Sequence, residues 1–216
     1  MATYMKIGII GSGTVGQTLA AKLAERRQDV MVSSRSPEKV AAWAAGAGVK
    51  VGSLSETASH GEIVINATKG EASVDALRAA GEANLAGKIL IDIANPLDFS
   101  GGMPPTLWVS NTDSLGEQIQ RAFPQTKVVK TLNTLNAGLM VNPGGLAGGD
   151  HTIFVSGNDA AAKAEVSRLL AQWFGWRDII DLGDITTARG TESLLPVWVR
   201  LMMAFGHANF QFKIVR

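Results

Sequence analysis

Short apolar runs alternate with amphipathic helical patterns through the first half of the chain. The runs that predict buried strands cover residues 6–10, 29–33, 50–52, 62–67, 88–93 and 127–132. Helices are expected between them at residues 15–25, 37–45, 73–80 and 114–122. Strands that alternate with helices are typical of βαβ units around a parallel sheet. The pattern therefore predicts an α/β protein with a doubly wound, mostly parallel sheet.

Two glycine-rich stretches interrupt this pattern. Residues 99–105 are rich in Gly, Pro and Met and predict a loop. Residues 136–150 separate the six predicted strands from a shorter unit, in which strands at 151–156 and 178–182 flank a helix at 160–173. We therefore predict a large domain at residues 1–136 and a small C-terminal α/β lobe at residues 137–216.

A closing helix follows in that lobe. It carries the apolar residues Leu194, Trp198, Leu201, Met202 and Phe205. Further apolar residues, among them Val197, Val199 and Met203, fall on other faces of the same helix. Pro196 suits the first turn of a helix that begins near Ser193. Because one core cannot cover every face, we expect a homodimer that packs through this helix.

The composition describes an ordinary globular protein. Of the 216 residues, 46% are apolar and 18% are charged, and the net charge of +1 offers no basic field for nucleic acid. No cysteine is present, which excludes disulfides, thiolate nucleophiles and Cys-bound metal. Residues 1–6 lack the apolar core of a signal peptide, and Arg200 interrupts the most apolar stretch, so no membrane span is expected. Cytoplasmic location is the default expectation.

A glycine motif stands between the first predicted strand and the first helix. It consists of Gly11, Ser12, Gly13, Thr14, Val15 and Gly16. In a dinucleotide-binding Rossmann fold, the first glycine permits a tight turn, the second lets the backbone approach a pyrophosphate, and the third lets helix and strand pack closely. The free N–H groups of the helix then face the anion. The motif predicts a Rossmann-type domain with a dinucleotide cofactor.

The residues after the second strand indicate which dinucleotide binds. An NAD site usually has Asp or Glu there to accept from the ribose 2′-OH. This chain has Ser33, Ser34 and Arg35 instead, with Lys39 one helical turn further on. An arginine binds a 2′-phosphate with its forked donors, hydroxyls donate to it, and a lysine adds positive charge. We therefore predict NADP(H).

Two turns are expected beside the nicotinamide, because ligands of doubly wound sheets bind beyond the carboxyl ends of the strands. The first turn contains Ala67, Thr68 and Lys69, and the second contains Asn95 and Pro96. Lys69 is either a cofactor contact or a surface lysine, and the sequence leaves both interpretations open.

Few residues suit acid–base chemistry. The only tyrosine, Tyr4, precedes the first strand, which excludes a Tyr-x-x-x-Lys reductase site. We expect His60 to be a surface histidine in a turn, His151 to be structural, and His207 to lie at an interface or cap. The catalytic residues are therefore unknown, and no metal site is expected. Transfer of a hydride between two stacked rings agrees with this lack of acid–base residues, because the cofactors themselves carry out the chemistry.

The chain resembles a known family. The loop GSGTVG, the turn Ser-Ser-Arg-Ser-Pro-Glu-Lys and the C-terminal Glu-Ser-Leu-Leu-Pro are similar to those of NADP oxidoreductases that use the deazaflavin coenzyme F420. The cytosolic domains of ferric reductases, which pair NADPH with a flavin, are also similar. The resemblance implies hydride transfer between nicotinamide and a tricyclic ring. It also implies NADP contacts at Gly11, Ser12, Thr14, Val15, Ser34, Arg35 and Lys39.

The acceptor side departs from the family pattern. Family members that bind the deazaflavin tend to have a His-Thr pair after the strand that corresponds to residues 127–132. Here the pair is Asn133 and Thr134, which the resemblance assigns to the acceptor side. A deazaflavin, an ordinary flavin (FMN or FAD) and other acceptors therefore stay open as the second cofactor.

Three functions agree with these observations. The first is an NADP(H)-dependent oxidoreductase with a deazaflavin or flavin acceptor. The second is an NADPH-dependent reductase of a small carbonyl or imine, with a proton donor such as Lys69, Asn133 or His151. The third is a non-catalytic module that senses NADP(H). The sequence favours the first.

Overall fold

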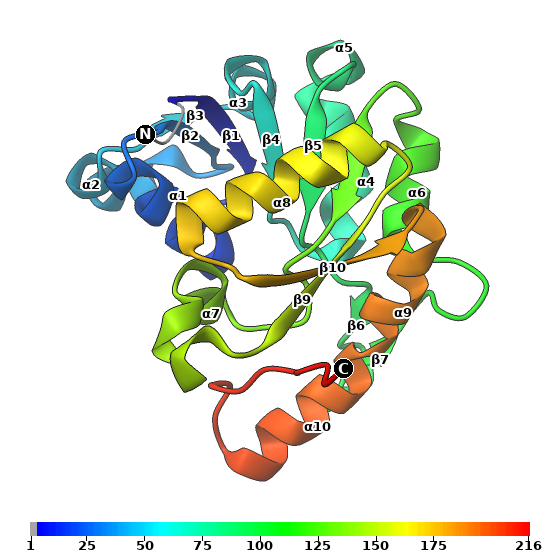
Figure 1. Ribbon diagram of the computed structural model, residues 1–216. Helices are drawn as coiled ribbons and strands as arrows, with labels where there is room; N and C mark the ends of the chain where they lie inside the picture. Colours follow the sequence, from blue (N-terminus) through cyan, green and yellow to red (C-terminus); the bar gives the residue numbers. More distant parts are fainter. Residues whose placement is uncertain (1–3) are drawn as a thin grey trace.

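A single twisted sheet forms the centre of the protein, with helices on both faces (Figure 1). The computed structural model describes residues 4–216. Residues 1–3, part of the segment in which no signal peptide is expected, lie outside the described residues. The eight-stranded sheet has the order β10-β9-β8-β5-β4-β1-β2-β3, which is the doubly wound order that the sequence predicts.

Buried apolar runs form the strands of this sheet. The strands are β1 (Lys6–Ile10), β2 (Asp29–Ser33), β3 (Lys50–Gly52), β4 (Ile63–Asn66), β5 (Ile89–Asp92), β8 (Lys127–Lys130), β9 (Thr152–Ser156) and β10 (Asp178–Gly183). Neighbouring strands are parallel except for β8 and β9, which pair antiparallel at Lys130 and Ser156. The carboxyl ends of β1, β2, β4, β5 and β8 therefore lie at one edge.

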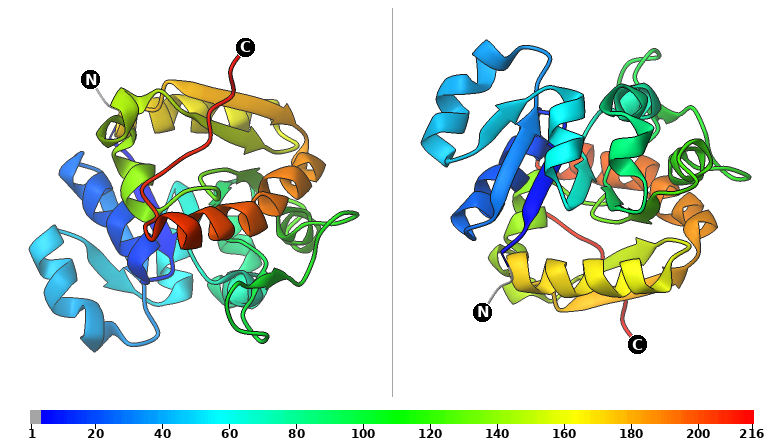
Figure 2. Two further views of the ribbon diagram at one scale, coloured as in Figure 1. Left: turned by 90° about the horizontal axis from the view of Figure 1, so that it is seen from below. Right: turned by 90° about the horizontal axis from the view of Figure 1, so that it is seen from above.

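The helices divide between the two faces of the sheet. They are α1 (Thr14–Glu25), α2 (Pro37–Ala47), α3 (Leu54–His60), α4 (Gly70–Ala80), α5 (Glu82–Leu85), α6 (Leu115–Ala122), α7 (Ala137–Val141), α8 (Ala160–Phe174), α9 (Ala188–Ser193) and α10 (Leu195–Phe205). One apolar core contains residues of α1, α7 and α8, and a second contains residues of α4 and α6. Figure 2 shows α8 (yellow) on one side of the sheet and α4 and α6 (green) on the other.

The structure confirms the predicted α/β Rossmann-type fold. The strands expected at residues 6–10, 29–33 and 50–52 have those bounds, and the others differ by one or two residues at their ends. Side chains of consecutive strand residues alternate between the two cores: Val64 lies in one, and Ile63 and Ile65 lie in the other. Strands covered on both faces need apolar residues at every position, which explains the continuous runs in the sequence.

Helix α3 was not expected from the sequence. Ser53 caps it: its hydroxyl accepts from the N–H of Glu56, and the Glu56 carboxylate accepts from the N–H of Ser53. The prediction that His60 is a surface histidine in a turn is wrong. It ends α3 with a side chain that is only 11% exposed, and its Nε2 lies 3.1 Å from the backbone oxygen of Asp29.

The C-terminal residues add to the same sheet. Strands β9 and β10, joined by α8, extend it beyond β8. Beyond α10 the chain returns to β9, where the N–H of Thr152 donates to the backbone oxygen of Phe212 (2.9 Å). The proposed division at residue 136 therefore falls within one continuous sheet, between β8 and β9, and stays a prediction about domain organisation.

The closing helix begins as its proline predicts. Helix α9 ends at Ser193, and α10 begins at Leu195 with Pro196 in its first turn. Within residues 4–216, no helix combines the length and the apolar character that a membrane crossing needs. The predicted loop at 99–105 is flanked by a short antiparallel ribbon of β6 (Leu97–Asp98) and β7 (Thr106–Leu107).

Candidate functional site

The glycine motif forms a tight turn from β1 into α1. Gly11 has a φ of +113°, which side-chain-bearing residues rarely adopt, and a Cβ there would lie 2.7 Å from the oxygen of Ala67. A Cβ at Gly16 would lie 2.0 Å from the oxygen of Gly11. These two glycines therefore allow β1, α1 and the turn after β4 to pack closely.

Gly13 differs from its neighbours because the space beside it is open. A Cβ at Gly13 would meet no atom within 4 Å. Gly13 is also the N-cap of α1, and no side chain caps this helix. Free N–H groups beside an open space suit a phosphate. This part of the chain therefore fits the pyrophosphate of a dinucleotide.

The residues expected at the ribose divide into two kinds. Ser33 is buried, and its hydroxyl accepts from the N–H of Gly11 (3.0 Å), so it supports the glycine turn from behind. The Ser34 hydroxyl accepts from the N–H of Ser36 (3.2 Å) and keeps its own proton for another acceptor. Arg35 and Lys39 are exposed at the start of α2. Ser34, Arg35 and Lys39 thus form a cationic, hydroxyl-bearing surface that suits a 2′-phosphate.

A cavity of about 210 Å³ opens at the carboxyl ends of β4 and β5. It is lined by Thr68, Lys69, Gly70, Glu71, Ile93, Ala94, Asn95, Leu97 and Phe99. The two turns expected beside the nicotinamide thus border one cavity, because Thr68 and Lys69 come from the first and Asn95 comes from the second. Ala67, at the base of the first turn, packs against Gly11, whereas Pro96 is buried.

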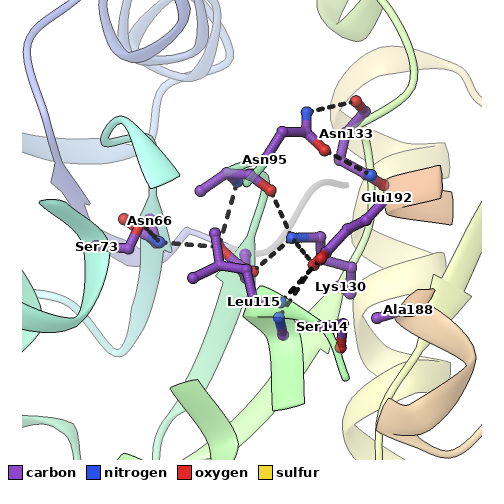
Figure 3. Close-up of polar contacts among 12 residues, drawn as sticks. Asn66, Ser73, Asn95, Ser114, Leu115, Lys130, Asn133, Ala188 and Glu192 are labelled. Atoms are coloured by element: carbon purple, nitrogen blue, oxygen red, sulfur yellow. Dashed lines mark hydrogen bonds and ion pairs between the residues drawn. The ribbon is translucent and has the colours of Figure 1, made fainter. Parts of the chain in front are cut away.

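Asn95 and Asn133 pair across the ends of β5 and β8 (Figure 3). Asn95 Nδ2 donates to the backbone oxygen of Asn133 (2.8 Å), and Asn133 Nδ2 donates to Asn95 Oδ1 (3.0 Å). Asn133 and Thr134 are both buried. Leu132, just before them, has a φ of +56°, which turns the chain sharply after β8. The Asn133 side chain therefore fixes the cavity edge through Asn95.

A buried lysine lies behind this edge. Lys130 Nζ contacts Asp92 Oδ2 (2.9 Å), Glu192 Oε1 (2.8 Å) and the oxygen of Ala94 (2.5 Å). Figure 3 shows Lys130 beside Glu192, which also accepts from the N–H groups of Leu115 and Gly116. Burial lowers the pKa of Lys130, but the charges of Asp92 and Glu192 outweigh it and raise the pKa above its usual value. Lys130 is therefore a buried cation.

The sequence prediction missed this buried cluster of Asp92, Lys130 and Glu192. Each residue stands alone in its local pattern, and Asp92 and Lys130 lie 38 positions apart in the sequence. The available signal was a charged residue at the end of an apolar strand, since Asp92 and Lys130 end β5 and β8. Charged residues are rarely buried unless they are paired.

The histidines lie away from the cavity. His151 is buried as expected for a structural residue: its Nε2 lies 3.0 Å from the oxygen of Pro143, and its ring packs edge-on against Trp176. His207 is exposed beyond α10, and its Nδ1 accepts from the N–H of Asn209 (3.2 Å). Within the residues that the structure describes, the cavity lining contains neither histidine nor tyrosine.

Known proteins share both the sequence and the fold. The family model described as "NADP oxidoreductase coenzyme F420-dependent" matches residues 6–96. A solved structure from Arthrobacter sp. FB24, provisionally described as an F420-dependent NADP-reductase, is 59% identical in sequence. The match covers 98% of this chain and 100% of that chain, with a TM-score of 0.95.

Two curated relatives also match nearly all of this chain. The F420-dependent NADP reductase of Methanothermobacter marburgensis is 29% identical over 210 residues, which make up 91% of this chain and 92% of that protein. The metalloreductase STEAP3 of Rattus norvegicus is 30% identical over 206 residues, or 93% of this chain. This chain spans only 39% of the length of STEAP3. Together with the glycine turn and the Rossmann-type sheet, these matches show that the chain belongs to the family of coenzyme F420-dependent NADP oxidoreductases.

Proposed function

We propose that this protein transfers a hydride between NADP(H), held at the glycine turn, and a deazaflavin of the F420 type that enters the cavity beside β4 and β5. The cavity itself carries this proposal. It borders both turns that are expected at the nicotinamide, and its lining contains Thr68, Asn95 and Phe99 but, among the described residues, no histidine or tyrosine. Within residues 4–216, the lining carries no ionisable side chain apart from Lys69 and Glu71, so it suits the orientation of two rings more than the protonation of a substrate.

The binding surfaces of the chain fit NADP(H) at both ends of the nucleotide. The open space at Gly13 and the uncapped start of α1 suit the pyrophosphate. Arg35 and Lys39 suit the 2′-phosphate, and no carboxylate stands between Ser33 and Arg35 to repel it. When bound, the nicotinamide supplies or accepts the hydride.

The protein's contribution at the cavity is orientation and exclusion of water. The side chain of Asn95 is held by Asn133, and Thr68 Oγ1 donates to Asn66 Oδ1 (2.7 Å). These polar groups are fixed in place before any ring arrives, which reduces the entropy lost on binding. Leu97 on β6 and Phe99 in the loop just after it add an apolar wall to the cavity.

One observation favours a second candidate, reduction of a small carbonyl or imine. Lys69 lines the cavity, and its exposed ammonium group is the proton donor that such a reaction needs. In that case Lys69 touches the substrate. Ring-to-ring transfer needs no such donor, so Lys69→Met separates the two reactions.

Stopped-flow oxidation of NADPH tests the proposal. The acceptors are coenzyme F420, FMN, FAD and a panel of small carbonyls and imines. We expect rapid oxidation with F420 in the wild type and in Lys69→Met. Oxidation only by FMN or FAD would assign an ordinary flavin, and oxidation only by a carbonyl or imine that Lys69→Met abolishes would assign the second candidate.

A further outcome decides whether the protein is an enzyme. If NADPH binds tightly but no acceptor oxidises it, the protein is a sensor of NADP(H) and the proposed hydride transfer is wrong. If NADPH does not bind, the assignment of the glycine turn itself is wrong.

A further inference from the structure

The buried cluster of Asp92, Lys130 and Glu192 carries two carboxylates and one ammonium group. The Lys130 and Asp92 side chains are fully buried, and that of Glu192 is 2% exposed. One cation between two anions leaves a net charge of −1 inside the protein. Water screens such a charge far less than it screens a surface charge.

Both carboxylates accept hydrogen bonds from fixed donors. Asp92 Oδ1 accepts from Asn66 Nδ2 (2.8 Å) and from the N–H of Ala94 (3.2 Å). Glu192 accepts from two N–H groups at the start of α6, at 2.8 and 3.0 Å. The partial positive charge of the α6 N-terminus offsets part of the charge of Glu192.

One residue of the cavity lining is hydrogen-bonded directly to the cluster. Ala94 lines the cavity, its N–H donates to Asp92, and its oxygen accepts from Lys130. Thr68, on the other side of the cavity, is linked to Asp92 through Asn66. The charged residues of the lining itself are Lys69 and Glu71, whose charges are opposite. The buried cluster is therefore a source of net negative charge behind this wall.

A nicotinamide ring changes charge when it is oxidised: the reduced ring is neutral, and the oxidised ring carries a positive charge. We infer that the cluster of Asp92, Lys130 and Glu192 biases the site toward the oxidised cofactor, so that NADP⁺ binds more tightly relative to NADPH than it would at a neutral wall. This inference rests on the proposed function, because it needs the nicotinamide beside Ala94. The bias favours hydride transfer out of NADPH within the complex.

The ratio of the dissociation constants of NADP⁺ and NADPH tests this bias without any acceptor. Asp92→Asn and Glu192→Gln each remove one negative charge and leave Lys130 paired with the other carboxylate. We expect each substitution to raise the ratio Kd(NADP⁺)/Kd(NADPH) by about three- to tenfold, the size of a screened interaction between unit charges several ångströms apart. NADPH fluorescence gives one constant, and displacement by NADP⁺ gives the other.

Glu117→Gln is the matched control. Glu117 pairs with Arg189 (2.6 Å) and so joins the same two helices, α6 and α9, but this pair is partly exposed through Arg189. Like Glu192→Gln, this substitution replaces a carboxylate with an amide and removes one negative charge from the protein. We expect it to leave the ratio unchanged, because Ser114 and Arg189, to which Glu117 is hydrogen-bonded, do not line the cavity.

Three outcomes distinguish the possibilities. An unchanged ratio in Asp92→Asn and Glu192→Gln, even with slower turnover, would overturn the inference and leave the cluster a purely structural role. An equal rise in Glu117→Gln would overturn it too, because total charge or helix position would then explain the effect. Failure of the wild type to bind NADPH contradicts the proposed function instead. Asp92 lies on β5 and Glu192 lies on α9. If one of the two substitutions prevents folding, the other variant still tests the inference.

Discussion

Gly16 lies so close to Gly11 that a Cβ at Gly16 would come within 2.0 Å of the Gly11 backbone oxygen. The contact joins the start of α1 to the end of β1, and neither backbone can withdraw without disturbing the sheet. Gly13, between them in the sequence, has open space instead. The same motif thus contains one glycine needed for folding and one that leaves room for a ligand.

Alanine at these two positions should therefore give opposite results. Gly16→Ala overpacks the turn and should lower the free energy of unfolding by about 1–3 kcal/mol. Gly13→Ala should cost at most about 1 kcal/mol, the difference between glycine and alanine at an N-cap, yet it should strongly weaken NADPH binding. Urea unfolding and NADPH fluorescence titration measure the two effects. Wild-type affinity in Gly13→Ala would show that the pyrophosphate binds elsewhere.

Arg35 should select the phosphorylated cofactor. A charge-assisted hydrogen bond is worth about 1.5–3 kcal/mol, so Arg35→Ala should weaken NADPH by about ten- to a hundredfold. The affinity for NADH, which lacks the 2′-phosphate, should change little. Arg26→Ala is the control, because Arg26 is also exposed but is the C-cap at the far end of α1. Equal loss of both cofactors in Arg35→Ala contradicts the selection of NADP.

The sheet and the glycine turn could be predicted because their signals are local. Apolar runs mark strands that are covered on both faces, and the glycine spacing reports a contact within six residues. Helix α3 escaped prediction because seven residues with few apolar side chains show little periodicity, although Ser53 and Glu56 have the spacing of a capping box.

For the site, the sequence could predict which residues take part but not which of them contact one another. Asn95 and Asn133 were both expected at the carboxyl edge of the sheet. Their hydrogen bond forms because β5 and β8 are neighbours in the sheet, and no local sequence pattern predicts that two strands are neighbours. The burial of Ser33 is likewise a tertiary effect, because its hydroxyl turns toward Gly11. Lys130 meets Glu192 only because α9 returns to the start of α6.

The Asp113–Arg121 pair should stabilise the protein in a pH-dependent way. The two hydrogen bonds from Arg121 (2.8 and 2.9 Å) lower the pKa of Asp113 to about 2. A depressed carboxyl pKa adds stability above the unfolded value of about 3.9 and loses it as the pH falls toward the folded value. Allowing for solvent screening, Asp113→Asn should cost about 1 kcal/mol at neutral pH.

Urea unfolding of wild type and Asp113→Asn between pH 7 and pH 2 measures this effect. The difference between the two proteins should shrink below about pH 4. A difference that stays constant over the whole range would mean that the carboxylate charge of Asp113 does not stabilise the fold.

Helix α10 should hold two copies of the chain together. Val197, Met203 and Phe205 are 51%, 49% and 53% exposed, although they are large and apolar. We expect a homodimer, and Met203→Glu should shift it toward monomer in light scattering. Leu182→Glu, at an exposed apolar position on β10, should not. A wild type that is monomeric at micromolar concentration contradicts the expectation.

Phe99 should contribute to acceptor binding rather than to NADPH binding. It lines the cavity from the loop that follows β6, and the residue is 57% exposed, so it is available to stack on a planar ring. Such stacking contributes about 0.5–1.5 kcal/mol beyond buried area, which corresponds to a rise of about three- to tenfold in the KM for F420 in Phe99→Ala. The dissociation constant of NADPH should not change. Met103→Ala is the control, because Met103 is similarly exposed on the same segment but does not line the cavity. If both substitutions raise the KM equally, the segment affects the acceptor through its general position, and the specific role of the Phe99 ring is wrong.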